Sequence, residues 1–481
     1  MTRPDEPAMR VRPPDASFSP DAFRRAGHAL VDRLADHLER ARRRELPALP
    51  RVDTDAERAR WRLSAAPRGL DALPALIDEV VLRSNHLHHP GYVGHQVSAP
   101  HPIAALGELV AGFLNNGMAV YEMGPAATAI ERELVAWFAR ELGLPADADG
   151  VFTSGGSIGN LTALLAMREL RAGDSAWEHG TRGKPQLCVL VSEQAHYSIA
   201  RATRILGWGR DGALGVAVDA QYRMRVDALE ERLARAREDG FQVLGVVGSA
   251  CTTATGAFDP LERVADVCAR EGLWLHVDGA HGSPAALSPK YRALVAGIER
   301  ADSVVADAHK MLLVPALSTA VLFRRGRDSW ATFAQEATYL FSGNSWDHAQ
   351  RTLECTKRML ALPLYLLLEC VGRDELARHV ERCFDLARTF AAQLRAADDF
   401  ELAVEPQANI VCFRHTPRGA EDLDGLQARL RERVLARERF YLVQTRLDGA
   451  LWLRTTLINP FTTEADLAEL LDALRAAARA T

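Results

Sequence analysis

The feature that most limits the fold of this 481-residue chain is an alternation of short β-rich runs with helical segments between about Leu87 and Phe341. Helical periodicity separates the runs, as in Ile158–Leu170 and Pro260–Glu271. The expected strands are Gly150–Thr153, Leu187–Val191, Val243–Val247, Trp274–Val277 and Ser303–Ala306. This order indicates an α/β fold with a mostly parallel central sheet and helices on both faces. Ligands of such sheets bind beyond the carboxyl ends of the strands, so the residues after each strand are the ones to examine.

Segments of different character flank this region. Ser19 and Pro20 are typical of a helix start, and apolar residues at helical spacing predict an amphipathic helix over Pro20–Arg44 that needs a surface to cover it. The C-terminal part is expected to contain a helical stretch at Arg351–Leu368, strands at Asn409–Arg414 and Ala450–Leu457, a helix near Leu423–Leu435, and a last helix opened by Thr463 and Asp466. We therefore expect an N-terminal helical segment at 1–86, a large domain at 87–350 and a small α+β domain at 351–481.

The composition excludes several classes of function. A net charge of −5, with no dominant basic block, argues against a nucleic-acid partner. The run Met359–Leu368 contains Pro363 and is too short to span a bilayer, and the N-terminus has no apolar signal region. The seven cysteines are scattered singly, which suits a reducing compartment. A cytoplasmic protein without membrane or nucleic-acid partners is expected.

Polar residues follow the first three predicted strands. The turn Thr153–Asn160, "TSGGSIGN", leads into a helix, and free backbone N–H groups there suit a phosphate, although the pattern equally fits a tight strand–helix turn. His196 begins the helix after the second strand, and a lone histidine is more often structural than functional. Thr252 and Thr253 follow the third strand, where hydroxyls can also cap a turn.

The fourth and fifth strands end in charged groups. Asp278 closes one apolar run, where an acid is unfavourable unless it is paired or hydrogen-bonded. Asp307, His309 and Lys310 follow the other, and Lys310 lies inside the apolar stretch "VVADAHKMLLVP". Its head could reach water, or its amine could be used chemically. The five strand ends together supply a phosphate turn, an imidazole, hydroxyls, an aspartate and a lysine. This combination predicts pyridoxal 5′-phosphate as the cofactor.

The sequence resembles the group II pyridoxal-phosphate amino-acid decarboxylases, which include glutamate, cysteine sulfinate, diaminobutyrate and aromatic amino-acid enzymes. The resemblance runs from about Leu87 to the end of the chain and is weakest at the N-terminus. It rests on the stretches "HPGYVGHQ", "YEMGP", "TSGGSIGNL", "HVDGAHGS", "DAHKM", "ATYLF", "RTLECTKR" and "LRTTLINP". It implies the fold of the type I pyridoxal-phosphate enzymes and an obligate homodimer with its sites at the subunit interface.

The resemblance also implies roles for individual residues. Lys310 would form the Schiff base with the cofactor, with His309 beside it, and Asp278 would face the pyridine nitrogen. His196 would stack on the cofactor face opposite Ala280. The remaining cofactor contacts would come from Gly156, Ser157 and Asp307 at the phosphate and from Thr253 near Asp278.

The resemblance identifies four further candidates around the substrate. Arg454 matches an arginine that binds a substrate carboxylate, and Tyr339 matches the tyrosine of a mobile catalytic loop, which would protonate Cα. His95 and Gln96 stand where aromatic-specific relatives carry bulky aromatic residues. This favours a small polar or acidic substrate such as aspartate, glutamate or cysteine sulfinate, while diaminobutyrate stays open.

The chain departs from the family pattern at His281, which replaces a bulky aromatic residue, and at Ser283, which replaces a glycine. Alternatives to a decarboxylase are an aminotransferase or aldehyde synthase of the same fold, and a non-enzymatic cofactor-binding regulator. Tyr339 favours simple decarboxylation over aldehyde formation. A zinc site is a further alternative, from His86, His88, His89 and His95, although their spacing matches no common zinc motif, and we expect no metal.

Overall fold

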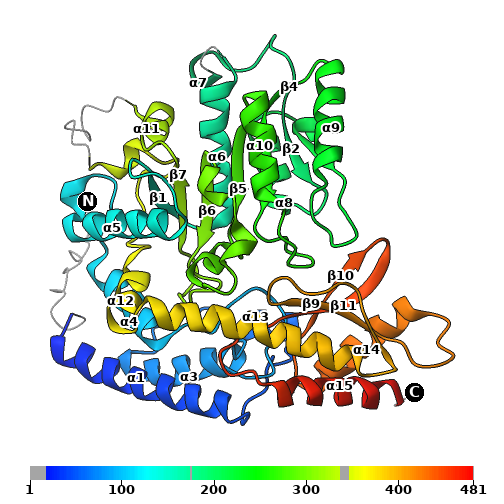
Figure 1. Cartoon of the computed structure of the whole chain (residues 1–481). Coiled ribbons are helices and arrows are strands. Elements are labelled where there is room, and N and C mark those ends of the chain that lie inside the picture. Colours follow the sequence, from blue (N-terminus) through cyan, green and yellow to red (C-terminus); the bar gives the residue numbers. More distant parts are fainter. Residues whose placement is uncertain (1–17, 174–175, 336–345, 480–481) are drawn as a thin grey trace, which may run out of the picture.

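The structure is a computed structural model and describes residues 18–173, 176–335 and 346–479. Its strands are β1 Asp149–Thr153, β2 Leu187–Ser192, β3 Ala213–Val216, β4 Gln242–Ser249, β5 Trp274–Asp278, β6 Ser303–Asp307, β7 Thr319–Phe323, β8 Phe400–Leu402, β9 Ile410–His415, β10 Val443–Leu447 and β11 Ala450–Thr456. They form a seven-stranded sheet in the order β1-β7-β6-β5-β4-β2-β3 and a four-stranded sheet in the order β10-β11-β9-β8 (Figure 1). The two sheets lie in different parts of the molecule, one above the other in this view.

The large sheet is mixed, with β7 as its single reversed strand. β6, β5, β4, β2 and β3 pair in parallel, whereas β7 is antiparallel to both β6 and β1. The prediction of a mostly parallel sheet is therefore confirmed, and β3 and β7 are additions to it. All five predicted strands are present, each within two residues of its expected bounds.

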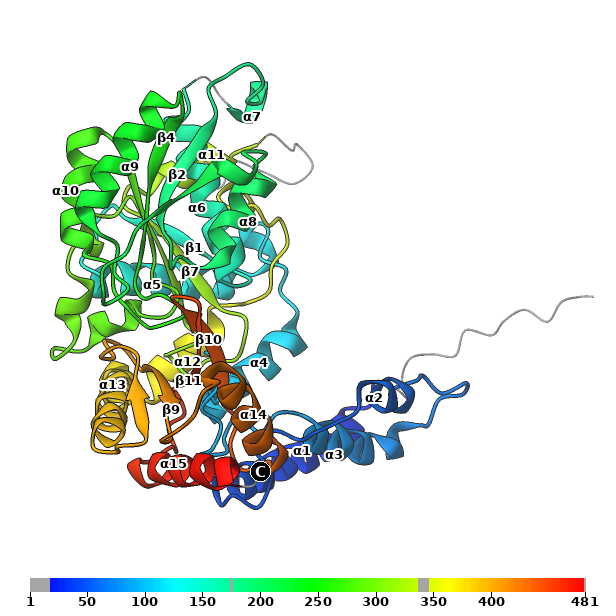
Figure 2. The ribbon, with the colours of Figure 1, turned by 90° about the vertical axis from the view of Figure 1, so that its right-hand side faces the viewer.

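Helices cover both faces of the large sheet, as Figure 2 shows. The helices from the N-terminus to the end of this sheet are α1 Pro20–Arg42, α2 Thr54–Arg60, α3 Leu73–Arg83, α4 Pro102–Leu114, α5 Pro125–Glu141, α6 Gly156–Arg171, α7 Ala176–His179, α8 Tyr197–Ile205, α9 Val226–Glu238, α10 Leu261–Glu271 and α11 Arg327–Phe333. α9 and α10 lie on one face, and α6 and α8 on the other. Neighbouring residues of β4 show the alternation, since Val246 belongs to one apolar core and Val247 to the other.

The C-terminal part combines the small sheet with α12 Leu362–Cys370, α13 Arg373–Arg395, α14 Leu423–Ala436 and α15 Glu464–Arg479. The predicted helix Arg351–Leu368 is wrong over its first eleven residues, which form bends and turns until α12 begins. The reason is tertiary: the Lys357 ammonium turns inward to Glu131 of α5, both side chains are buried, and Lys357 also donates to the Phe152 carbonyl at 2.9 Å.

The predicted helix starts at both ends of the chain are confirmed. Ser19 caps α1, with its hydroxyl accepting from the Ala22 N–H at 3.3 Å. Thr463, just before α15, and Asp466 in its first turn exchange hydrogen bonds. α1 and α3 pack against each other, and the segment that contains α1 to α3 extends to one side of the molecule (Figure 2). Within the described residues, no helix has the length and apolarity needed to cross a membrane.

Candidate active site

The loops that follow β1, β2, β4, β5 and β6 open at one edge of the large sheet, because these five strands point the same way. The reversed strand β7 starts at that edge, and its first residue, Thr319, donates from its hydroxyl to Asp307 Oδ1 at 2.5 Å. The sheet topology thus gathers the polar residues that the sequence scatters over about 160 positions.

Lys310 forms an ion pair with Asp307 just beyond β6. Lys310 Nζ lies 3.0 Å from Asp307 Oδ2, and His309 Nε2 lies 3.6 Å from the same oxygen. Burial alone would lower the pKa of the Lys310 amine, but the carboxylates of Asp307 and Asp278 outweigh it, and the pKa is raised. Burial in turn acts to raise the pKa of Asp307, and Lys310 and His309 overcome this, so that its pKa is lowered. In the free protein the pair is therefore a charged lysine held by a charged aspartate.

Asp278 ends β5 with its side chain buried. Its Oδ1 accepts from the Ala280 N–H at 3.2 Å, and its Oδ2 accepts from Asn160 Nδ2 at 3.0 Å. Ala280 itself is 8% exposed and follows in the same turn. Each carboxylate oxygen keeps a second lone pair, so Asp278 can accept one more hydrogen bond from a ligand.

His196 caps α8 and lies at the same edge. Its Nδ1 lies 2.8 Å from the Ser198 hydroxyl and 3.4 Å from the Ser198 N–H. Burial lowers the pKa of His196, against the opposing effect of Asp278. The imidazole is therefore neutral near pH 7 and offers a flat face next to charged neighbours.

The turn after β1 leaves bare backbone at the start of α6. Gly155 has a φ of 104°, which favours glycine. A side chain at Gly156 would place its Cβ 3.2 Å from Asp307 Oδ1 and 3.6 Å from the Ala280 Cβ, so the glycine keeps this point open. The side chain of Ser157 is exposed. The N–H groups of the helix start suit an anion such as a phosphate.

The small sheet contributes Arg454, from β11, to this edge. Its guanidinium donates from Nη1 to the Thr253 carbonyl at 3.0 Å, while its buried Nε has no hydrogen-bond partner among the described residues. His95 lies close by: burial, then the charge of Arg454, lowers its pKa. The next residue, Gln96, also carries a buried amide nitrogen without a partner in the described part of the chain. Arg454 and Gln96 thus each hold a buried donor without a partner among the described residues.

One expected contact is placed differently, and the departure at His281 lies in the interior. The Thr253 hydroxyl makes no hydrogen bond to Asp278 in the described ranges, and Thr253 joins the site through its carbonyl instead. His281 lies fully inside the protein and donates from Nε2 to Asn409 Oδ1 at 2.7 Å, with Nδ1 left unpaired among the described residues. Tyr339 lies outside the described residues.

Comparison with known proteins identifies the family. A profile of the "Pyridoxal-dependent decarboxylase conserved domain" matches residues 76–416. The chain belongs to the pyridoxal-dependent decarboxylases. It is 33% identical over 407 residues to the L-2,4-diaminobutyrate decarboxylase of Rhizobium meliloti (strain 1021), covering 82% of this chain and 80% of the relative. It is 32% identical over 403 residues to the mouse cysteine sulfinic acid decarboxylase, covering 80% and 81%. The crystal structure of mouse CSAD superposes with a TM-score of 0.90 at 27% identity, covering 95% of this chain and 99% of the other.

Family membership confirms the fold class and the cofactor expected from the strand ends. The decarboxylase is a pyridoxal-phosphate-dependent lyase that acts on an amino acid. Membership of this family also argues against an aminotransferase and against a non-enzymatic regulator. The residues of this edge fit the cofactor, because they combine an amine, a buried carboxylate with free lone pairs and a glycine turn that a Cβ would fill.

The zinc alternative gains no support. The four histidines do not form a ligand cluster with one another or with acids or cysteines in the described ranges. Three of them contact backbone atoms instead: His86 Nδ1 lies 2.6 Å from the Pro47 carbonyl, His88 Nε2 lies 2.9 Å from the Pro100 carbonyl, and His89 Nδ1 accepts from the Gly91 N–H at 2.9 Å.

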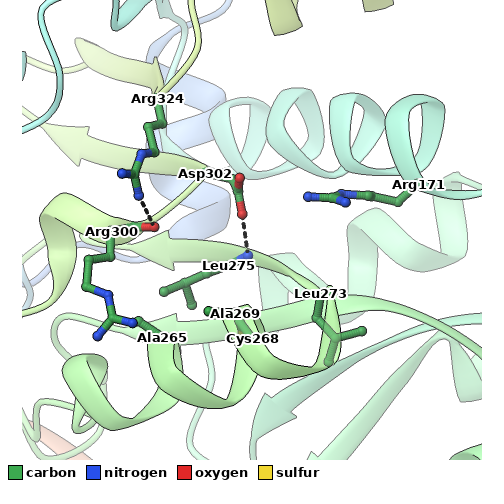
Figure 3. A pocket seen from close by; sticks show the side chains of 10 residues that line it. Arg171, Ala265, Cys268, Ala269, Leu273, Leu275, Arg300, Asp302 and Arg324 are labelled. Carbon is green, nitrogen blue, oxygen red and sulfur yellow. Dashed lines mark hydrogen bonds between the residues drawn. The ribbon is translucent and has the colours of Figure 1, made fainter.

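A cavity of about 230 Å³ lies next to the residues that precede β5 and β6, as Figure 3 shows. Arg171, Arg300, Arg324 and Asp302 line it, at the start of β6 rather than at its end. Arg300 is paired with Asp266, Arg324 donates to the Arg300 carbonyl at 3.0 Å, and Asp302 accepts from the Leu275 N–H at 3.0 Å. These three charged side chains are thus paired within the protein, and the cavity takes no part in the site.

Sequence reasoning missed the polar residues behind Asp278. Asn160, Ser198, His276 and Ser303 are buried and linked by hydrogen bonds. A signal was present, because His276 precedes Asp278 by two positions and therefore points to the same face of β5. Asn160 likewise closes the motif of the phosphate turn.

Proposed function

We propose that this decarboxylase acts on a small acidic amino acid, such as aspartate, glutamate or cysteine sulfinate. The observation that carries the proposal is the set of donors around Arg454. A guanidinium with an unpaired Nε, together with the unpaired amide nitrogen of Gln96, suits a carboxylate or sulfinate and repels a second ammonium group. The exposed His95 adds a polar rather than a bulky aromatic wall.

Diaminobutyrate is the second candidate, because a relative of that name is 33% identical. The proposed donor set opposes it, since diaminobutyrate carries an additional cationic amine. The free lone pairs of Asp278 are assigned to the ring nitrogen of the cofactor, and Asp307 is paired with Lys310, so neither carboxylate is proposed to bind such an amine.

The cofactor roles are proposed on the same geometry. Lys310 holds the cofactor, Asp278 faces its ring nitrogen, and the neutral imidazole of His196 stacks on the ring opposite Ala280. Backbone N–H groups at Gly156 and Ser157 bind the phosphate. An ionised Asp307 carboxylate has no hydrogen to donate to a phosphate, so its proposed role is to hold Lys310 and Thr319 beside Gly156.

Bound pyridoxal phosphate supplies an electron sink for the electrons of the breaking bond at Cα. Asp278 would serve this chemistry by accepting a hydrogen bond from the protonated ring nitrogen. Arg454 orients the substrate and Thr253 orients Arg454. The Tyr339 hydroxyl is proposed to return a proton to Cα, an assignment that rests on the sequence resemblance.

A substrate panel assayed for CO2 and amine release tests the proposal. We expect kcat/KM for the best acidic substrate to exceed that for diaminobutyrate and for aromatic amino acids by at least about 100-fold, the effect of one well-placed charged contact. Arg454→Met should remove most of this preference, whereas Arg446→Met, at an exposed arginine of β10 paired with Asp424, should not. Lys310→Ala serves as the inactive reference. Faster turnover of diaminobutyrate than of every acidic substrate would refute the substrate proposal.

A homodimer and a cytoplasmic location are proposed with it. Exposed apolar side chains gather on α4, where Leu106, Leu109, Val110, Phe113 and Leu114 are between 43% and 69% exposed, an arrangement that a second copy of the chain would cover. All seven cysteines are free, which suits a reducing compartment. We also propose that the chain divides into an N-terminal helical segment at 1–86, a large domain at 87–350 and a small domain at 351–481.

A further inference from the structure

We propose that Asn160 is a positioning residue that fixes both the carboxylate of Asp278 and the tautomer of His196. This inference rests on the proposed use of pyridoxal phosphate at this edge. It gives one buried amide control over the two side chains assigned to the cofactor ring, one at its nitrogen and one on its face.

Both donor hydrogens of the Asn160 amide, and one lone pair of its oxygen, are engaged in hydrogen bonds. The side chain is 1% exposed. Its Nδ2 donates to Asp278 Oδ2 at 3.0 Å and to the Ser198 hydroxyl oxygen at 2.9 Å. Its Oδ1 accepts from His276 Nε2 at 2.9 Å. A reversed amide would place its oxygen against the Asp278 carboxylate, so only one orientation satisfies all three partners.

A chain of buried donors holds this orientation from behind. His276 donates from Nε2, so its Nδ1 must accept in the neutral ring, and it takes the Ser303 hydroxyl hydrogen at 2.9 Å. The Ser303 oxygen in turn accepts from Trp274 Nε1 at 2.9 Å. Burial lowers the pKa of His276 to about 4 despite the Asp278 carboxylate, which keeps the ring neutral near pH 7. The donor and the acceptor of each hydrogen bond between Trp274 and Asp278 are therefore fixed.

The second arm of the amide reaches His196. Because the Ser198 oxygen receives a hydrogen from Asn160, its own hydrogen is free to point to His196 Nδ1, 2.8 Å away. The Ser198 N–H approaches the same nitrogen at 3.4 Å. Nδ1 is then an acceptor, and the hydrogen of the neutral imidazole lies on Nε2. A protonated His196 would have to donate from Nδ1 instead, which reverses this hydrogen bond and turns the Ser198 hydroxyl hydrogen away from the ring.

The consequence is a link between ring charge and ring stacking. Loss of the Asn160 donors would leave Asp278 with a single hydrogen bond, from its own turn, and would raise its affinity for a proton. The same loss would release the Ser198 hydroxyl and with it the His196 tautomer. A residue that only filled space would have neither effect.

Asn160→Asp tests the inference, because it keeps the shape and replaces two donors by acceptors. With pyridoxal phosphate as the probe, we expect its dissociation constant to rise about 10- to 100-fold, the range for hydrogen bonds to a charged group. The pH midpoint of the visible absorption band of the bound cofactor should shift by at least about 0.5 unit. Thr162→Val, at a buried hydroxyl of the same helix that has no partner in the described residues, is the control and should change neither quantity.

Ser198→Ala separates the two arms and guards against misfolding of the first variant. It should leave the dissociation constant of the cofactor within about threefold while lowering kcat about 3- to 10-fold, the range for one neutral hydrogen bond. A folded Asn160→Asp protein with the parent's cofactor affinity, spectral midpoint and kcat would overturn the inference alone. If Asn160→Asp does not fold, an unchanged kcat in Ser198→Ala overturns it. A parent protein that does not take up pyridoxal phosphate would overturn the proposed site, and the inference with it.

Discussion

At the scale of single residues, the site depends on opposite charges that are held ready before any ligand arrives. Lys310 lies in an apolar stretch of sequence, yet its ammonium is stabilised by Asp307 at 3.0 Å and by the nearby Asp278. The raised pKa of Lys310 means that the amine is protonated near pH 7, and a protonated amine cannot attack an aldehyde. In the protein without cofactor, Lys310 is therefore held in its protonated form, which does not react with an aldehyde.

Asp307→Asn should make cofactor capture less dependent on alkaline pH. The Asp307 carboxylate raises the pKa of Lys310, so its removal lowers that pKa and leaves more neutral amine at a given pH. We expect the rate of reconstitution of the cofactor-free protein to rise with pH in both proteins, with the rise at lower pH in the variant. Stopped-flow absorbance between pH 6 and about pH 10 measures this. Identical pH profiles would show that Asp307 does not control the lysine.

The residues that sequence alone identified are those with chemistry at a strand end. Asp278, Asp307 and Lys310 interrupt apolar runs, and such interruptions are conspicuous. Asn160 and His276 are polar residues inside regular elements, where sequence gives no sign of which partner satisfies them. Their role depends on β5 and α6 lying side by side, which only the tertiary structure provides.

At the scale of elements, the clearest difference from prediction is the segment 351–361. Its pattern fits a helix, but a buried ion pair between Lys357 and Glu131 sets its path. Burial acts to raise the pKa of Glu131, but Lys357 and then His348 reverse this, and its pKa is lowered. Strands β3 and β7 were missed because the first is four residues long and the second follows a proline-containing loop without a helix between it and β6.

Lys357→Met should destabilise the fold strongly. It leaves Glu131 buried without its cation, which typically lowers the free energy of unfolding by about 3–5 kcal/mol. Urea denaturation measures the loss. Lys290→Met is the matched control: it removes an exposed lysine paired with Asp385, and such surface pairs contribute at most about 1 kcal/mol. A double variant with Glu131→Gln should recover part of the lost stability, and a single variant as stable as the parent would contradict the buried-pair account.

At the scale of the whole molecule, the N-terminal helices and α4 leave an apolar surface that the rest of the chain does not cover. Phe113 of α4 is 69% exposed although its ring lies 5.1 Å from that of Phe23 in α1. The amphipathic helix expected over Pro20–Arg44 is present as α1 and ends two residues earlier. Its exposed apolar side chains, Phe23, Val31 and Leu34, add to this surface.

Phe113→Glu should weaken self-association. A carboxylate placed in an apolar contact between two copies loses its hydration without a partner, so the dimer dissociates at protein concentrations at which the parent remains paired. Sedimentation velocity over a dilution series measures the shift, and decarboxylase activity should fall with it. Glu238→Lys, an exposed charge change on α9, should leave the association unchanged. A parent chain that sediments as a monomer at all concentrations would refute the homodimer.

The hydrogen bond from Arg454 to the Thr253 carbonyl joins two sheets that are built from separate stretches of the chain. The groups assigned to the cofactor come from the large sheet, and the guanidinium assigned to the substrate comes from the small one. The stretch that contributes Arg454 is thus separate from the stretch that supplies the cofactor groups, while His95 and Gln96, also proposed to face the substrate, precede the large sheet. Substitutions in the last 130 or so residues can therefore alter one proposed substrate contact while the cofactor-binding groups are inherited unchanged.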